Sequence, residues 1–413
     1  MPETSESPIS AAGNPSRRTV LGIAAATAAA AAAPLVGDVP AAQAASKAAV
    51  KETVKETAKV PEELVFISTW KGTQIYGAWF DPEHGDMTLI GPVGAAVSNW
   101  ATMHPVKPVL YVGGGQDGGF VYSYDFDPAT GLLTQTGTVR TDPGGTAGGG
   151  VSYLMVDSPS KTILVANFEA GLTAAVPIEQ GVMGEPVSIV QDTGSGPNAR
   201  QLSPHPHYVA VDPTGRYALV PDFGADRIFV YRFDRRTRAL SASEVNGTGY
   251  YQTDPGSGPR RVLFHSGGRT LYTLNELTAT IEILDWDPAA EKLTRRQILS
   301  TDTPDFTGTK SGAELALGAD GRFLYTSNRG ENALVVYRID ERTELLEEVQ
   351  RIPCAGQVPW SFTIHRTGRW LFVANEMSNT VNLFSVDRAS GKLTDTGRPV
   401  PVPNPDCITF YYR

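Results

Sequence analysis

Four segments of this chain share one pattern: proline or a small residue, a short apolar strand, a glycine-containing turn with arginine, and a second strand that ends near Asn, Asp or Glu. They are residues 206–222, 259–276, 313–329 and 359–376. Fainter copies begin near Asn99 and Val151. Repeats of about 45 to 55 residues that are rich in β-branched and aromatic residues are typical of propeller blades rather than of helical solenoids. The six copies therefore predict an all-β fold with six such blades, and a further blade is expected from the two ends of the repeat region.

The two ends of the repeat region supply the remaining blade. Leu64–Trp70 has the pattern of a second strand without a first, and Cys407–Tyr412 has that of a first strand without a second. Third strands such as residues 280–287 alternate apolar and polar residues, and fourth strands follow them after a tight turn. We therefore predict a seven-bladed β-propeller of four-stranded blades, in which the C-terminal strand joins the first blade and closes the ring. Closure also removes an open sheet edge, which would otherwise invite aggregation.

Residues 1–44 do not follow the repeat. Ser16–Gly22 contains two consecutive arginines, Leu21–Val36 is an alanine-rich apolar stretch, and Ala42–Ala44 resembles a small-residue cleavage site. This order predicts a Tat-type export signal. A membrane-spanning helix is the alternative, but the stretch is short, mildly apolar and interrupted by Pro34. We expect export by the Tat route to an extracellular, periplasmic or envelope location, with no stable membrane insertion after cleavage.

The rest of the chain is predicted to be a linker, residues 45–63, followed by one domain, residues 64–413, because the repeats run without a change in composition. The formal net charge of −9 argues against nucleic acid as a partner. Nothing in the pattern suggests more than a monomer. The two cysteines, Cys354 and Cys407, could form a disulfide in an exported protein, but two buried free thiols are favoured, and no CxxC zinc motif is present.

Ionisable residues at strand ends of consecutive blades are the candidate catalytic groups. The repeat aligns His207 with Arg260 at the start of inner strands, and aligns Asp222 with Glu276 and Arg329 at the end of second strands. Such positions must cluster around the axis. A base or acid pair that faces two arginines can activate water, stabilise an oxyanion and hold an anionic group. The inventory fits a small anionic sugar lactone or sugar acid and needs no cofactor, although structural salt bridges in the channel wall are the alternative.

Neighbouring polar residues are candidates for substrate binding. They are His205, Asn198, Arg200, Asn275 and Asn328. His205 and His207 lie on one face of an extended segment and could in principle bind a metal, but no further ligand follows at a suitable spacing. No metal site is therefore predicted.

At these residues the chain resembles the seven-bladed β-propeller lactonase family, which includes bacterial 6-phosphogluconolactonase and the fungal carboxy-muconate lactonizing enzyme. The similar segments are SPHPH (Ser203–His207), GPR (Gly258–Arg260), NEL (Asn275–Leu277) and GADGRFLYTSNR (Gly318–Arg329). The likeness extends over the whole repeat region. It implies that the His, Arg, Glu and Arg proposed as the family's active site fall on His207, Arg260, Glu276 and Arg329, and that the chain hydrolyses a lactone without a cofactor.

Two features depart from that family. Bacterial members commonly have His after GPR, whereas Arg261 follows here, and strand alternation predicts that its side chain faces away from that of Arg260. In addition, 6-phosphogluconolactone forms in the cytoplasm, whereas this chain carries a predicted export signal. Three functions therefore stay open: a hydrolase of a sugar-acid lactone, a non-catalytic ligand-binding propeller of the envelope, and a muconate-type lactonizing cycloisomerase.

Overall fold

The computed structural model describes residues 62–115, 118–144 and 150–412, which belong to one compact unit, residues 58–413. The predicted export signal and nearly all of the predicted linker lie outside the described residues. Within the part of the chain that is described, the secondary structure is almost entirely β-strand, and no helix is long and apolar enough to cross a lipid bilayer.

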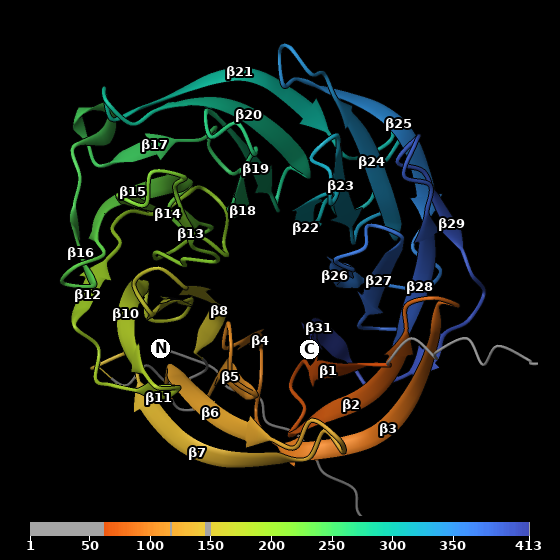
Figure 1. Ribbon diagram of the computed structural model, residues 1–413. Coiled ribbons are helices and arrows are strands. Elements are labelled where there is room, and N and C mark those ends of the chain that lie inside the picture. Colours follow the sequence, from red (N-terminus) through yellow and green to blue (C-terminus); the bar gives the residue numbers. More distant parts are fainter. Residues whose placement is uncertain (1–61, 116–117, 145–149, 413) are drawn as a thin grey trace, which may run out of the picture. The chain divides into compact units, whose positions relative to one another are not determined.

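Seven antiparallel sheets surround a common axis. In six of them the strand that comes first in the chain lies nearest the centre, and in the seventh the C-terminal strand β31 (Pro405–Tyr411) takes that place (Figure 1). Each sheet is one blade of the predicted propeller. Four blades have four continuous strands, whereas in blades 3, 4 and 7 the fourth strand is divided into two short strands that pair with the same third strand. The fold is thus an all-β seven-bladed propeller, as the repeat predicts.

Every blade runs from an innermost strand at the axis to an outermost strand at the rim. In this order, blade 1 contains β31 (Pro405–Tyr411), β1 (Glu63–Thr69), β2 (Gln74–Asp81) and β3 (Asp86–Ala95), and blade 2 contains β4 (Trp100–Met103), β5 (Val109–Gly114), β6 (Phe120–Phe126) and β7 (Leu133–Arg140). Blade 3 contains β8 (Val151–Asp157), β9 (Thr162–Asn167), β10 (Leu172–Glu179), β11 (Val182–Met183) and β12 (Ser188–Gln191). Blade 4 contains β13 (Ala210–Val211), β14 (Tyr217–Asp222), β15 (Arg227–Asp234), β16 (Ala239–Ala242) and β17 (Tyr250–Gln252), with the 3-10 turn η1 (Val245–Gly247) between the last two. Blade 5 contains β18 (Pro259–Phe264), β19 (Thr270–Asn275), β20 (Thr280–Asp287) and β21 (Lys292–Ser300), and blade 6 contains β22 (Gly312–Leu317), β23 (Phe323–Asn328), β24 (Ala333–Ile339) and β25 (Leu346–Pro353). Blade 7 contains β26 (Pro359–Ile364), β27 (Trp370–Asn375), β28 (Thr380–Val386), β29 (Leu393–Asp395) and β30 (Val400–Pro401).

The C-terminal strand closes the ring as predicted. Strand β31 pairs with β1 in an antiparallel register that places Leu64 opposite Tyr411. A charged contact strengthens the same junction, because Glu63 Oε2 lies 2.5 Å from His365 Nε2 and Glu63 Oε1 lies 2.6 Å from Arg366 Nη2. The sequence pattern places Glu63 in the linker, but it is the first residue of β1. The N-terminal end of the repeat region is thereby tied both to the C-terminal strand and to blade 7.

The hydrophobic core lies between blades rather than within them. Each of seven buried apolar clusters combines residues from two neighbouring blades. Between blades 7 and 1, for example, the Phe372 ring meets those of Phe80 and Phe410 edge to face, at centroid distances of 4.7 and 5.0 Å. Full burial of one such side chain stabilises a fold by roughly 1.5 to 3 kcal/mol. A blade therefore depends on its neighbours, and the ring holds the inner strands in fixed positions.

Several inner strands contain a β-bulge near their first residues. The register with the second strand shifts between Val151 and Tyr153 in β8, between Pro259 and Arg261 in β18, and between Pro359 and Ser361 in β26. A bulge inserts one residue that is not matched across the ladder and turns its side chain in a new direction. Bulges at these points aim additional side chains toward the axis.

The two cysteines are both buried and free, which confirms the favoured prediction. Burial raises the pKa of the Cys354 thiol to about 11 and that of Cys407 to about 12. Neither thiol is therefore ionised near neutral pH.

Candidate active site

A cavity of about 530 Å³ lies at the axis, and all seven blades contribute to its wall. Its volume falls within the range of roughly 300 to 1,000 Å³ that small-molecule sites occupy. The ionisable residues that line it are Lys71, Glu169, Arg200, His207, Arg260, Arg261, Glu276 and Arg329, and the aromatic residues are Trp70, Trp100, Phe168 and Trp360. All four predicted catalytic residues line this cavity.

Glu276 is the centre of an ion-pair network. It follows β19 directly, and its Oε2 lies 3.1 Å from Arg260 Nη1 and 2.9 Å from Arg329 Nη2. Its other oxygen, Oε1, lies 2.8 Å from Arg200 Nη2. Glu276 and Arg260 are each only 2% exposed. One buried carboxylate thus holds three guanidinium groups together, two of them from consecutive blades.

The two inner arginines are oriented by further contacts. Arg260 Nε donates to the Ala313 carbonyl at 2.8 Å, and Arg329 Nε donates to Ser311 Oγ at 3.0 Å. Both guanidinium groups also lie over the Trp360 ring, with Cζ 5.7 Å from the ring centroid for Arg260 and 4.8 Å for Arg329. Because these contacts fix each side chain, the arginines keep their direction when an anion replaces part of the Glu276 contact.

Charge and burial set the protonation of Glu276. Burial by itself raises the pKa of a carboxyl group, but the charges of Arg329, Arg260 and Arg200 outweigh it and lower the pKa of Glu276 to about 2. Glu276 is therefore an ionised carboxylate at neutral pH.

His207 lies against Arg260 on the wall of the cavity. Its Nε2 is in contact with Arg260 Nη1, and its Nδ1 has no hydrogen-bond partner among the described residues. Burial, followed by the charges of Arg260 and Arg261, lowers the pKa of His207 well below 6.5, so the imidazole is neutral. Since a guanidinium group can only donate, Nε2 accepts and the proton is assigned to Nδ1. His207 therefore offers an N–H donor and has no free base.

The structure thus brings His207, Arg260, Glu276 and Arg329 together, and it adds Arg200 to them. Arg200 is 58% exposed and stacks over Phe223 with Cζ 4.6 Å from the ring centroid, so it reaches Glu276 from the mouth of the cavity. The three arginines and His207 can hold an anion and polarise a carbonyl group beside the ionised carboxylate of Glu276.

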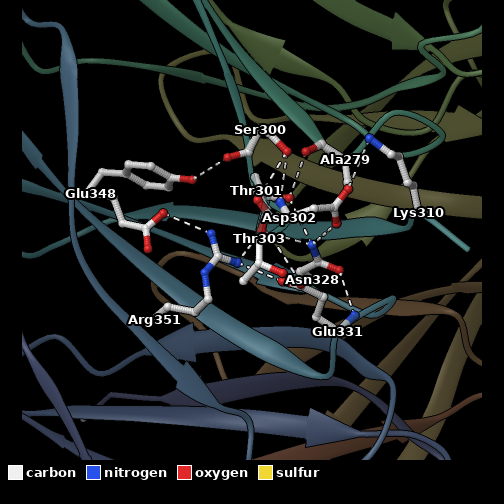
Figure 2. Close-up of polar contacts among 11 residues, drawn as sticks. Ala279, Ser300, Thr301, Asp302, Thr303, Lys310, Asn328, Glu331, Glu348 and Arg351 are labelled. Atoms are coloured by element: carbon white, nitrogen blue, oxygen red, sulfur yellow. Dashed lines mark hydrogen bonds and ion pairs between the residues drawn. The ribbon is translucent and has the colours of Figure 1, made fainter. Parts of the chain in front are cut away.

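The other predicted substrate contacts do not line the cavity. Asn328 Nδ2 donates to the Thr301 carbonyl at 3.1 Å and to Asp302 Oδ1 at 2.7 Å, within the network of polar contacts that Figure 2 shows. Asn275 Nδ2 donates to Glu282 Oε1 at 3.0 Å. Both asparagines are fully buried, and their side-chain amides link neighbouring segments of the chain.

His205 and Asn198 also serve the surrounding structure. The His205 ring stacks on Phe168 at a centroid distance of 4.4 Å, and its Nδ1 lies 2.9 Å from the Phe168 carbonyl oxygen. Asn198 Oδ1 accepts from the Arg200 backbone N–H at 2.9 Å and so shapes the loop that carries Arg200. Within the described part of the chain, no group of three or more His, Cys, Asp or Glu residues is placed to hold a metal ion.

One alignment of the repeat was wrong by a single residue. Asp222 is the last residue of β14 and is equivalent to Asn275 and Asn328, as the pairing of each with the following strand shows. Glu276 and Arg329 each lie one position after these asparagines, just outside the strand. This shift explains why the asparagines are structural while their neighbours face the cavity.

Sequence reasoning also missed two residues of the cavity wall. Strand alternation predicts that Arg261 faces away from Arg260, but both line the cavity, because the bulge in β18 interrupts the alternation between them. Trp360 occupies the position of blade 7 that Arg260 occupies in blade 5, immediately after the proline that begins the strand. Extending the alignment of His207 with Arg260 to blade 7 would have found it.

Comparison with known proteins shows which chains this one is similar to. The family described as "Lactonase, 7-bladed beta-propeller" matches residues 65–410. The chain is 30% identical to 6-phosphogluconolactonase of Bacillus subtilis over 296 residues, a match that covers 71% of this chain and 81% of that protein. It is 28% identical to 6-phosphogluconolactonase of Serratia proteamaculans over 340 residues, a match that covers 82% of this chain and 95% of that protein. Among solved structures, the periplasmic gluconolactonase of Pseudomonas aeruginosa superposes with a TM-score of 0.77 at 29% identity and covers 85% of this chain and 99% of that chain.

Proposed function

Because the chain belongs to the seven-bladed β-propeller lactonase family, we propose that it is a hydrolase that opens a sugar-acid lactone of the 6-phosphogluconolactonase or gluconolactonase type. The observation that carries this proposal is the contact of one buried carboxylate, Glu276, with three arginines inside the axial cavity. Such a site places positive charge where the oxyanion of ester hydrolysis develops and keeps a carboxylate beside it.

In the proposed reaction, Glu276 is the base that activates water. His207 is the weaker candidate, because its Nε2 is occupied by Arg260 and its proton is assigned to Nδ1. In the free site the three arginines keep the pKa of Glu276 near 2, which makes it a weak base. When the lactone carbonyl accepts a hydrogen bond that Arg260 or Arg329 otherwise donates to Glu276, the pKa of Glu276 rises toward its ordinary value, so substrate binding itself prepares the base.

The remaining groups have complementary roles. Arg260 and Arg329 stabilise the oxyanion on the former carbonyl oxygen, and Arg200 holds an anionic group at the mouth of the cavity. The proton that Glu276 takes from water passes to the departing ring oxygen, which leaves as a hydroxyl group. The acyl carbon becomes a carboxylic acid, which releases its remaining proton to solvent and leaves the carboxylate. His207 donates a hydrogen bond through Nδ1 to a substrate oxygen.

We further propose that the protein acts as a monomer outside the cytoplasm. The twin-arginine segment Ser16–Gly22 supports export, and the similar protein from Pseudomonas aeruginosa is described as periplasmic. An exported enzyme would meet a lactone formed or released outside the cell, which favours a sugar-acid lactone other than the cytoplasmic 6-phosphogluconolactone.

The direct test is hydrolysis of 1,5-gluconolactone and of 6-phosphogluconolactone by the purified protein, followed through the acid released. We expect turnover above the spontaneous rate, and at least a hundredfold loss in Glu276→Gln and in Arg329→Ala, in line with about 2.7 to 4 kcal/mol for one oxyanion contact. Binding of sugar acids without any turnover would instead indicate a ligand-binding propeller. Full activity in both variants would place the chemistry elsewhere.

A further inference from the structure

Arg261 is a buried cation for which the proposed reaction has no role. It lies on the cavity wall, is 2% exposed, and pairs through Nη2 with Glu314 Oε2 at 2.8 Å. Its Nε and Nη1 are buried and have no hydrogen-bond partner among the described residues. Buried guanidinium N–H groups are costly to leave unpaired, so these two donors point to a ligand group.

Three aromatic rings surround the same guanidinium group. Arg261 Cζ lies 4.5 Å from the ring centroid of Trp100, 5.2 Å from that of Tyr153 and 4.8 Å from that of Tyr208. Aromatic faces attract the cation but accept no strong hydrogen bond from its N–H groups. They therefore hold Arg261 in place while leaving its donors available to an acceptor that enters the cavity.

The charges around the cavity favour a ligand with two negative groups. The wall holds Arg260, Arg261 and Arg329 inside and Arg200 at the mouth. The carboxylates against them are those of Glu276 and of Glu314, which pairs with Arg261 behind the wall, so an excess of two positive charges remains. Lys71 and Glu169, at the exposed rim, compensate each other. This excess stands out in a chain whose formal net charge is −9, and it attracts anions into the cavity.

We propose that Arg261 forms a second anion-binding position, which receives a carboxylate or phosphate group at the end of the ligand away from the reacting carbonyl. The bulge in β18 makes this possible, because it directs two successive arginines into one cavity. This inference rests on the proposed function, because the first anionic group of the ligand is the carboxylate that opening of the lactone creates. The preferred product is then a dianion, and the preferred substrate is a lactone that already carries one acidic group.

Calorimetric titration of the purified protein with three six-carbon acids tests this proposal. Gluconate has one carboxylate, glucarate has a second carboxylate, and 6-phosphogluconate has a phosphate in addition to its carboxylate. We expect at least one of the two dianions to bind roughly tenfold to a hundredfold more tightly than gluconate, the range of one charge-assisted hydrogen-bonded contact. If both dianions bind more tightly than gluconate, a carboxylate suffices at the second position. If only 6-phosphogluconate does, the position is specific for phosphate.

The variant that locates the preference is Arg261→Gln combined with Glu314→Gln, which removes the pair without leaving a buried charge. It should bind gluconate as the wild type does and lose the preference for dianions. The matched control is Arg235→Gln with Asp157→Asn, because that pair, 2.6 Å apart, lies outside the cavity.

Equal binding of all three acids by the wild type overturns the proposal even if the double variant does not fold, and so does a preference that survives in the folded double variant. Lactone hydrolysis is measured in a separate assay. If the preference for dianions fails, the proposed hydrolysis is unaffected, and if hydrolysis fails, the binding preference is still tested on its own.

Discussion

Replacing Glu276 by glutamine should weaken the folded protein in a way that depends on pH. The pKa of Glu276 lies at about 2, against 4.5 for an ordinary glutamate, and this difference corresponds to about 3 kcal/mol in favour of the folded state. Removing the carboxylate also leaves Arg260 buried without its counter-charge, and breaking a buried pair in this way costs about 3 to 5 kcal/mol. Both routes predict a loss of about 3 kcal/mol or more near neutral pH.

The direction of the pH dependence follows from the lowered pKa. A carboxyl group whose folded-state pKa is depressed stabilises the fold above its unfolded pKa and loses that contribution as the pH falls toward the folded value. The contribution of Glu276 should therefore fall from about 3 kcal/mol at about pH 7 to about 2 kcal/mol at about pH 3.5. Urea unfolding of wild type and Glu276→Gln, followed by tryptophan fluorescence at both pH values, measures this difference.

A matched surface variant separates this effect from a general loss of charge. Glu347 pairs with Arg338 at 2.5 Å, but its side chain is 68% exposed, so Glu347→Gln should cost less than about 1 kcal/mol. A difference between wild type and Glu276→Gln below about 1 kcal/mol near neutral pH, or one that stays constant on acidification, would refute the reasoning.

Three other predictions follow from the same contacts. Arg200→Ala removes one of the three charges that lower the pKa of Glu276, so acid unfolding should begin at a higher pH than in the wild type; an unchanged acid midpoint would show that Arg200 does not hold the carboxylate. Because the pKa of His207 lies well below 6.5, the rate of lactone opening should show no inflection near that pH, and an inflection that disappears in His207→Gln would contradict the neutral assignment. Ending the chain before Pro405 removes β31 together with Ile408 and Phe410 of the cluster between blades 7 and 1, so the shortened protein should lose cooperative thermal unfolding in calorimetry; a transition like that of the wild type would mean that ring closure is dispensable.

The fold could be predicted from the sequence because blades repeat. The same turn and strand pattern recurs six times, and the two incomplete segments at its ends complete each other through β1 and β31. The pattern also aligns His207 with Arg260, which are equivalent in the ring and touch each other. Periodicity carries this information because each blade packs against its neighbours in the same way.

The parts of the site that the sequence did not predict depend on departures from that periodicity. Strand alternation places Arg261 away from the cavity, and only the bulge in β18 brings it in. Asn275 and Asn328 resemble ligand contacts because they precede Glu276 and Arg329, but one residue along a strand reverses the direction of the side chain. The extra residue of a bulge leaves no mark in a single sequence, so such errors arise where the ladder is irregular.

The irregular first residues of the inner strands also bear on how the protein could be redesigned. Ser152, Arg260 and Trp360 sit at comparable bulges in three different blades and all reach the same cavity. Since the backbone at these positions is already released from regular pairing, exchanging one of these side chains need not disturb the sheets behind it. Arg260 and Trp360 belong to the Glu276 network, whereas Ser152 does not, so a library at Ser152 would test whether one bulge position alone can change the specificity of the cavity.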